Sequence, residues 1–265
     1  MNAKRKIFIS STVEDLKEER EYLLKKIKEL SNDYIVFEPY LSEYSETFHF
    51  TERELSMCDS VEICMKKVQE CNYYVLLIKD NYNATCGLSV TELEYIKAKE
   101  LHKPIFAFVL ESENRKAETE KFVERISNEK WRFIANDKCE IFENLQSILN
   151  ELDSSTYVGE WPSDCIIVSK GTVFTKSWTI KNTGNQVWKN RYMKHIVPAT
   201  NMVPFRDKIE MPEVRPDEEY EFKVSYTVKK EGVTHSRWKM YNENGQECFS
   251  SNEYKGLWFD VNVRS

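Results

Sequence analysis

The sequence predicts two domains of different class: an α/β domain with a five-stranded parallel sheet, then an all-β sandwich. Up to Leu152, short apolar strands alternate with helical segments, which is typical of βαβ units. After Leu152 the helical periodicity stops, and short alternating strands separated by turn residues take over. The 265 residues are enough for two cores of ordinary size. We therefore assign residues 1–153 to the first domain and 157–265 to the second.

The first domain is expected to contain five strands, with helices between them. Because parallel strands are covered on both faces, their sequences should be continuously apolar. Tyr74–Ile78 and Ile105–Val109 are continuously apolar, which places the third and fourth strands inside the sheet. The expected strands are Lys6–Ser10, Tyr34–Glu38, Tyr73–Ile78, Pro104–Leu110 and Trp131–Ile134.

The second domain has the turn residues and the length of an immunoglobulin-like sandwich. The segments 182–185 (NTGN) and 243–246 (ENGQ) are expected to form hairpin turns, because Asn and Gly tolerate the positive φ angles that such turns need. About seven strands fit into this part of the chain, as in an immunoglobulin-like sandwich.

Charge and hydropathy exclude several classes of partner. The formal net charge is −6, with 38 basic and 44 acidic residues, so no basic surface for nucleic acid or an anionic membrane is expected. No apolar run approaches the roughly 18 residues that span a bilayer, and residues 1–6 lead into a strand instead of a signal peptide. The seven cysteines lack C-x-x-C spacing, so no metal site is predicted. We expect a cytoplasmic protein.

Glycine is scarce in the first domain, and its scarcity limits the chemistry expected there. Residues 1–158 contain one glycine, Gly87, and the other six follow. Loops that hold phosphates need several glycines, so that backbone amides can approach the ligand. The sequence therefore excludes P-loop enzymes and conventional dehydrogenases, and it predicts no bound cofactor.

A pocket is expected where the first and third strands end. In a flavodoxin-like sheet the crevice lies beyond the carboxyl ends of these two strands. The helix that begins after Ser89 follows directly and should close one side. The strand-end side chains expected in the pocket are Ser10, Ser11, Asp80 and Tyr82. A structural alternative exists for the serines, since Ser11 or Thr12 could cap the first helix.

Glu92 has an expected structural role on the helix from Ser89 to His102. Residues 89–92 (SVTE) form a capping box, in which the glutamate at the third helical position bonds back to the cap residue. On a helical projection Glu92 shares one side with Lys99, opposite the apolar stripe. We therefore expect Glu92 on the side of the helix away from the sheet.

Glu94 has no such role. At about 100° per residue it falls between Val90, Ala98 and Leu101, on the stripe that should face the sheet. A buried carboxylate is costly unless it is paired or functional. The alternatives for Glu94 are therefore a functional role or an ion pair with Lys97, three residues along the helix.

The opening of the first domain resembles an uncharacterised family of the TIR superfamily. Residues 7–12 (IFISST), followed by Asp15-Leu16 and Glu19-Arg20, match the pattern F-[IV]-S-S-T-x-x-D-L-x-x-E-R. The resemblance continues through residues 60–64, 71–73 and 89–95 to Lys103-Pro104. One departure follows the third strand, where the family pattern G-x-x-Y-G corresponds to residues 79–83 (KDNYN), which contain no glycine.

This resemblance implies a catalytic glutamate. TIR domains and nucleoside deoxyribosyltransferases, which the segment also resembles, place it on the helix before the fourth strand. In the deoxyribosyltransferase pattern a threonine lies three residues before the glutamate and a proline ten after, as Thr91 and Pro104 lie around Glu94. Glu92 remains an alternative, because the TIR form often has leucine directly after its glutamate.

The resemblance also implies an activity: cleavage of the N-ribosidic bond of NAD or a related nucleotide, in bacterial antiviral defence. One carboxylate, Glu94, is sufficient when the leaving nitrogen is positively charged, as in nicotinamide, because no general acid is then needed. NAD would be a substrate and not a cofactor, and Thr91 joins the expected substrate-binding residues. The alternative is a non-enzymatic scaffold or adaptor that self-associates through its α/β domain.

Residues 157–265 resemble the four-tryptophan immunoglobulin-like domain, the central module of a selective-autophagy receptor that also occurs in bacterial proteins. The resemblance rests on the order of Trp178, Trp188, Trp238 and Trp258. It implies recognition of a protein partner, with the loops at one end of the sandwich as the contact. Tryptophans at cross-strand positions are more often core residues than ligand contacts. No catalytic motif surrounds His195 or His235.

Overall fold

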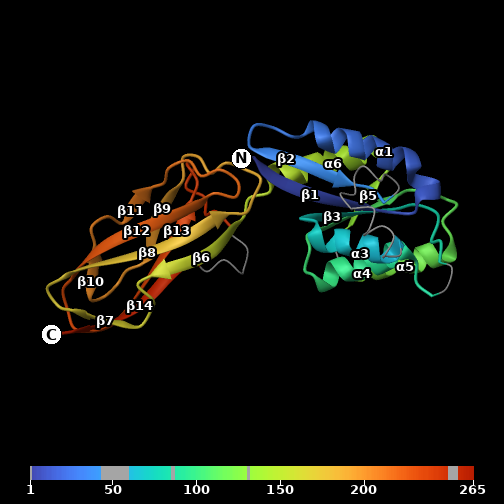
Figure 1. The fold of residues 1–265 in the computed structure, drawn as a ribbon. Coiled ribbons are helices and arrows are strands. Elements are labelled where there is room, and N and C mark those ends of the chain that lie inside the picture. Colours follow the sequence, from blue (N-terminus) through green and yellow to red (C-terminus); the bar gives the residue numbers. More distant parts are fainter. Residues whose placement is uncertain (1, 43–59, 85–86, 130–131, 250–255) are drawn as a thin grey trace. The chain divides into compact units, whose positions relative to one another are not determined.

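The computed structural model describes residues 2–42, 60–84, 87–129, 132–249 and 256–265 (Figure 1). The chain divides into two compact units, Met1–Leu149 and Asn150–Ser265. The first contains helices and one sheet, and the second contains two sheets, so the predicted α/β and all-β classes are confirmed. Within the described ranges, no helix combines the length and apolarity that crossing a membrane requires.

The first unit is a parallel five-stranded sheet with helices on both faces. The strands lie in the order β2-β1-β3-β4-β5, and all neighbouring pairs are parallel. Figure 1 shows α1 and α6 on one face and α3, α4 and α5 on the other. The elements are β1 (Ala3–Ser10), α1 (Val13–Glu29), β2 (Ile35–Tyr40), α3 (Ser60–Glu70), β3 (Tyr73–Ile78), α4 (Val90–Glu100), β4 (Ile105–Leu110), α5 (Ala117–Glu129), β5 (Arg132–Ala135) and α6 (Lys138–Glu151).

The strands agree with their predicted positions apart from their ends. Every residue of β3 is buried, as expected for a strand inside a parallel sheet. β2 extends past its predicted end through Pro39, which an edge strand tolerates because one side of its backbone needs no partner. β5 begins at Arg132, and Trp131, where the fifth strand was predicted to begin, lies outside the described residues.

The second unit is a sandwich of two sheets with strand orders β10-β12-β8-β6 and β11-β9-β13-β14-β7. Nine strands are described instead of the roughly seven predicted, because the three-residue strands β10 and β11 extend the sheet edges. All pairs are antiparallel except β7 with β14. The strands are β6 (Ser155–Trp161), β7 (Ile166–Ser169), β8 (Val173–Asn182), β9 (Tyr192–Val197), β10 (Met202–Pro204), β11 (Lys208–Glu210), β12 (Glu219–Val228), β13 (Gly232–Tyr241) and β14 (Leu257–Arg264).

One of the two predicted hairpin turns is wrong. The segment after β13 does turn, with Gly245 at φ +75° and the Asn242 amide bonded to the Gln246 carbonyl. By contrast, the segment 182–185 leads from β8 in one sheet to β9 in the other. Gly184 is needed there for a close approach, because a Cβ would lie 2.7 Å from the Ser154 nitrogen. Pattern alone does not distinguish a close approach from a tight turn.

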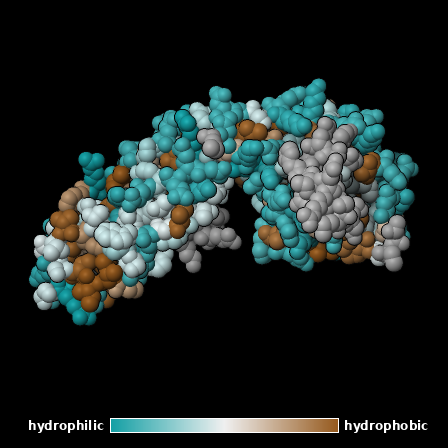
Figure 2. All heavy atoms as spheres, in the orientation of Figure 1, coloured by the Kyte–Doolittle hydropathy of each residue, from teal (hydrophilic) through white to brown (hydrophobic). Residues whose placement is uncertain are grey.

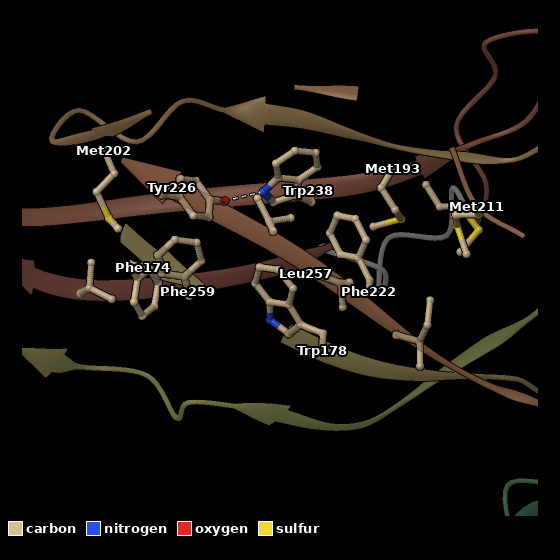
Figure 3. Close-up of a cluster of buried hydrophobic side chains, with 14 of the residues drawn as sticks. Phe174, Trp178, Met193, Met202, Met211, Phe222, Tyr226, Trp238, Leu257 and Phe259 are labelled. Carbon is tan, nitrogen blue, oxygen red and sulfur yellow. Dashed lines mark hydrogen bonds between the residues drawn. The ribbon is translucent and has the colours of Figure 1, made fainter. Parts of the chain in front are cut away.

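Three of the four family tryptophans form the core of the sandwich. Trp178, Trp188 and Trp238 are fully buried, whereas Trp258 is partly exposed. Figure 3 shows the indole nitrogen of Trp238 donating to the Tyr226 hydroxyl, at 2.7 Å, between aromatic and methionine side chains. The tryptophans are therefore mainly core residues, as expected from their cross-strand positions.

His195 belongs to the same core. Its ring stacks on Trp238 with centroids 4.8 Å apart, and its Nε2 atom bonds to the Ser236 hydroxyl at 2.7 Å. Burial lowers the pKa of His195. Because Ser236 is itself buried, this pair is a satisfied core contact and not an accessible nucleophile with its base.

Candidate functional site

A cleft of about 430 Å³ lies at the carboxyl ends of β1 and β3. These strands are neighbours, but β2 lies on the far side of β1, so the strand order reverses at this point. Parallel α/β sheets bind ligands at such a reversal. The cleft is within the roughly 300–1,000 Å³ of small-molecule sites. The residues that line it include Ser10, Ser11, Arg20, Tyr82, Thr91 and Glu94.

Five of the six side chains predicted at the site line the cleft, and Glu94 is among them. The Glu94 side chain is only 5 % exposed and accepts a hydrogen bond from the hydroxyl of Ser10 at the end of β1. The predicted ion-pair partner, Lys97, pairs instead with Glu100 at 3.2 Å on the exposed side of α4. Glu94 is therefore a buried carboxylate held at the cleft wall from a neighbouring strand.

The buried stripe of α4 differs from the predicted one. Val90 and Leu101, expected to face the sheet, are exposed. The buried residues are Thr91, Glu92, Glu94, Tyr95 and Ala98. Four of them follow the i, i+3, i+4, i+7 spacing of one helix face, so the stripe is rotated by about one residue from the prediction. The rotation brings Thr91 to the cleft beside Glu94.

The prediction for Glu92 is half right. The Ser89 hydroxyl accepts the Glu92 amide at 3.2 Å, which confirms the N-cap. The carboxylate does not lie on an exposed side, because Glu92 is only 2 % exposed. It accepts a hydrogen bond from the Tyr82 hydroxyl and forms an ion pair with Arg125 of α5. Helix α5 covers this side of α4, and a single helix projection cannot show a covering neighbour.

Neither proposed hydroxyl caps α1. Thr12 occupies the N-cap position, but its side chain makes no cap bond and donates to the Asp15 carboxylate instead. The Ser11 hydroxyl accepts a hydrogen bond from Arg20 at 2.7 Å and donates to the Thr12 carbonyl. Both hydroxyls are thus used to fix the segment that joins β1 to α1 beside the cleft.

Asp80 does not line the cleft, contrary to the prediction. Its amide and that of Asn81 donate to the Asp15 carboxylate at 2.9 and 2.8 Å. Its carbonyl accepts from the Thr119 hydroxyl at 2.8 Å and from the Lys116 amide at 3.1 Å. The backbone of Asp80 therefore ties the loop after β3 to both α1 and α5.

The loop after β3 reaches the cleft without glycine. Tyr82 and Asn83 both line the cleft. Asn83 adopts φ +49°, at the position where the family pattern has its second glycine. Asparagine enters this left-handed region more readily than other non-glycine residues, because its short side chain bonds locally. Asn83 therefore provides the conformation for which the pattern uses glycine.

Arg20 lines the cleft and Asp15 holds the loop after β3, and the prediction assigned a role to neither residue. The Arg20 guanidinium is fully buried and bonds to the Ser11 hydroxyl at 2.7 Å and, at 3.4 Å each, to the Ile9 carbonyl and the Ser42 hydroxyl. The available signal was its position on the apolar stripe of α1, where it is buried together with Leu16 and Leu23. A charged residue on such a stripe indicates a specific partner.

On the side of the sheet, Glu94 is surrounded by side chains that are buried from water. Tyr74 of β3 is fully buried, and its hydroxyl donates to the Thr91 carbonyl at 3.4 Å. Burial, followed by the nearby Glu94 carboxylate, raises the pKa of Tyr74 well above its usual range. In the part of the chain that is described, no group of three His, Cys, Asp or Glu side chains could hold a metal ion.

Comparison with known families assigns both regions. Residues 6–157 match the model of DUF4062, described as a domain of unknown function. Residues 163–263 match the Ig-like domain from next to BRCA1 gene, so the C-terminal region is an Ig-like β-sheet domain. No curated protein matches the chain.

Solved structures resemble parts of the chain at low identity. The Clostridium botulinum CMP N-glycosidase BcmB is 16% identical, with a TM-score of 0.34, and the match covers 55% of this chain and 100% of that one. The CARDB domain of the PF1109 protein from Pyrococcus furiosus is 17% identical, with a TM-score of 0.32, and the match covers 43% of this chain and 94% of that one.

Proposed function

This chain belongs to the DUF4062 family, and we propose that its α/β domain cleaves the N-ribosidic bond of NAD or a related nucleotide. The position of Glu94 carries the proposal: a buried carboxylate on the wall of a cleft at the carboxyl ends of β1 and β3. The strand order β2-β1-β3-β4-β5 supports a flavodoxin-like, TIR-like domain. The motif resemblance set out above supports the same assignment.

Cleavage of the N-ribosidic bond of NAD requires one carboxylate. The bond between C1′ of the ribose and the pyridinium nitrogen breaks, and its electron pair leaves with neutral nicotinamide. Water supplies the oxygen that bonds to C1′ and releases one proton. Glu94 stabilises the positive charge that develops on the ribose ring, or attacks C1′ to give an intermediate that water hydrolyses. The Ser10 hydroxyl holds the carboxylate in place for either role.

The other lining side chains suit a sugar. Ser11 and Thr91 line the same cleft as Glu94 and Ser10. The Ser11 hydroxyl donates to the Thr12 carbonyl and accepts from Arg20, so one lone pair of its oxygen remains for a ribose hydroxyl. A threonine hydroxyl such as that of Thr91 can both donate and accept. We therefore propose that Ser11 and Thr91 bind the ribose.

Nicotinamide release from NAD tests the proposal, with the full chain assayed in its free and oligomerised states. Glu94→Gln removes the charge and keeps the shape, and we expect a fall in kcat of about 100-fold or more. Glu100→Gln, on the exposed side of the same helix, is the matched control and should leave the rate unchanged. If the unmodified chain releases no nicotinamide, the proposed reaction is contradicted and the alternative is a self-associating scaffold. If Glu94→Gln keeps the full rate, Glu94 is not the catalytic carboxylate.

We also propose that the Ig-like domain binds a protein partner, which would make the chain an effector joined to a recognition module. Trp161 and Phe205 are 71% and 62% exposed. The strand pairings place Trp161, Val173 and Val203 on the outer face of the sheet β10-β12-β8-β6. Figure 2 shows hydrophobic side chains gathered near β10. Exposed apolar patches of this kind often mark protein contacts.

A capture experiment tests the recognition role. The full chain is cross-linked in cells of its source and compared with a Trp161→Ser, Phe205→Ser variant. The control carries Ile167→Ser on β7, an exposed position in the opposite sheet. We expect the double variant to lose the partner that the wild type and the control both retain. Equal capture by all three chains would exclude this face.

A further inference from the structure

Tyr82 has a fixed orientation at the cleft wall. Tyr82 lines the cleft, and its ring packs at 71° against Phe122 of α5, with centroids 6.2 Å apart. Its hydroxyl donates to the Glu92 carboxylate. The loop that carries it is tied down through the amides of Asp80 and Asn81. The hydroxyl, the ring and the loop backbone of Tyr82 are each fixed by a contact, so the ring has a preorganised orientation.

Glu92 is connected to the cleft wall through the Tyr82 hydroxyl. The residue is 2 % exposed and is not among the residues that line the cleft. Arg125 of α5 forms an ion pair with the same carboxylate, which holds it beside the Tyr82 hydroxyl. Burial and Glu92 both raise the pKa of Tyr82, so the phenol stays a protonated donor. Glu92 therefore differs in role from Glu94, which lines the cleft.

We propose that Tyr82 is the surface on which the planar base of the substrate stacks, and that Glu92, held by Arg125, is the residue that positions the Tyr82 ring. The inference rests on the proposed N-ribosidic cleavage, because that reaction requires a flat heteroaromatic leaving group beside the ribose. Tyr82 and Glu94 both line the same cleft. A ribose held at Glu94 thus leaves its base within the space that Tyr82 borders, and aromatic side chains bind any planar base by stacking.

The assignment resolves the choice between the two glutamates of α4. The glutamate that touches substrate is Glu94, and Glu92 is a positioning residue. It also explains why Glu92 is buried although its carboxylate makes no capping bond. The substrate class that follows is a nucleoside or nucleotide with an accessible base face, recognised by its base and its ribose.

Binding measurements separate this inference from the proposed reaction. Ligand-observed NMR is used to measure the Kd of NAD and of ribose 5-phosphate, which has no base, for the full chain. Tyr82→Leu removes the ring, and we expect NAD to bind about tenfold or more weakly while ribose 5-phosphate binds as before. Loss of both ligands to the same extent would mean collapse of the cleft and would overturn the inference.

The contribution of Glu92 is tested by a double-mutant cycle. Tyr82→Phe keeps the ring and breaks its bond to Glu92, and Glu92→Gln alters the same bond from the other side. Each substitution should raise the Kd of NAD about two- to tenfold. The Kd of the double variant should not exceed the larger of the two single-variant values. Fully additive effects would overturn the positioning role, as would a Glu92→Gln variant that loses kcat with an unchanged KM.

The outcomes for reaction and recognition can be told apart. A wild-type chain that binds NAD without releasing nicotinamide contradicts the proposed reaction, and the Kd ratios then decide the stacking role alone. A wild-type chain that binds ribose 5-phosphate but shows no preference for NAD contradicts the stacking role. So does a wild-type chain that binds neither ligand. Thermal melting of each variant confirms that the compared chains are folded.

Discussion

Asp15→Ala is expected to release the loop that carries Tyr82. The Asp15 carboxylate accepts the amides of Asp80 and Asn81 at 2.9 and 2.8 Å, and it also accepts the Thr12 hydroxyl. The two amides come from a part of the chain 65 and 66 residues away. Without Asp15, both lose the acceptor that the structure provides, and the connection between α1 and the end of β3 is lost.

The size of the effect follows from these contacts. A hydrogen bond to a charged group contributes about 1.5–3 kcal/mol, and partly exposed groups fall at the lower end because water can replace the lost partner. Two such bonds predict that Asp15→Ala lowers the stability of the loop by about 2–4 kcal/mol. Asp15→Asn keeps one acceptor oxygen and should cost about half as much.

Amide hydrogen exchange of the full chain, measured by NMR, tests this prediction at the two amides that Asp15 accepts. The amides of Asp80 and Asn81 should exchange about 30-fold to 1,000-fold faster in Asp15→Ala, since each 1.4 kcal/mol corresponds to a factor of ten. Glu14→Ala, the neighbouring exposed residue, is the matched control. Unchanged protection of both amides in Asp15→Ala would show that the carboxylate does not hold the loop and that Tyr82 is not oriented through Asp15.

Three further predictions concern other positions. Gly184→Ala should lower the free energy of unfolding by about 2 kcal/mol or more, because the added Cβ would lie 2.7 Å from a backbone nitrogen. Gly159→Ala, where the added Cβ meets open space, should lower it far less. Urea unfolding of the two variants measures the difference. Asn83→Gly should be nearly neutral and Asn83→Ala should cost about 1–2 kcal/mol, since φ is +49°; a lower cost for alanine than for glycine in thermal melting would contradict this. Burial lowers the pKa of His195 in the folded chain below its unfolded value of 6.5. The neutral ring therefore contributes its full stability above pH 6.5, and this contribution is lost as the pH falls through the pKa of the folded state. Melting temperatures from pH 7 to pH 5 should therefore fall less steeply in His195→Gln than in the wild type.

Most of the first domain was predictable because its signals are local. Continuous apolar runs such as Tyr74–Ile78 require burial on both faces, so the sequence alone indicates strands inside a parallel sheet. The carboxyl ends of parallel strands meet at one edge, so Ser10 and Tyr82 could be placed at one site before any coordinates. Helical phase likewise put Glu94 on a buried face.

The errors arose where a neighbour distant in sequence decides the outcome. Glu92 was expected on the side of α4 away from the sheet, and the sequence did not indicate that α5 covers that side and supplies Arg125. Asp80 was expected in the cleft, but its backbone is bound by Asp15 and Thr119 from two helices. The segment around Gly184 was read as a hairpin turn, although its glycine is required by the passing backbone of Ser154.

By itself, therefore, the sequence determined the fold classes, the strand ends that meet, and the candidate glutamate. Only the tertiary structure decided that Glu94 is held by Ser10, that Glu92 is held by Arg125 and Tyr82, and that Asp80 serves through its backbone. The physical reason is that the hydrophobic periodicity of a helix or strand indicates which of its faces is buried. The hydrogen-bond or ion-pair partner of a buried polar group depends instead on which other elements pack against that face.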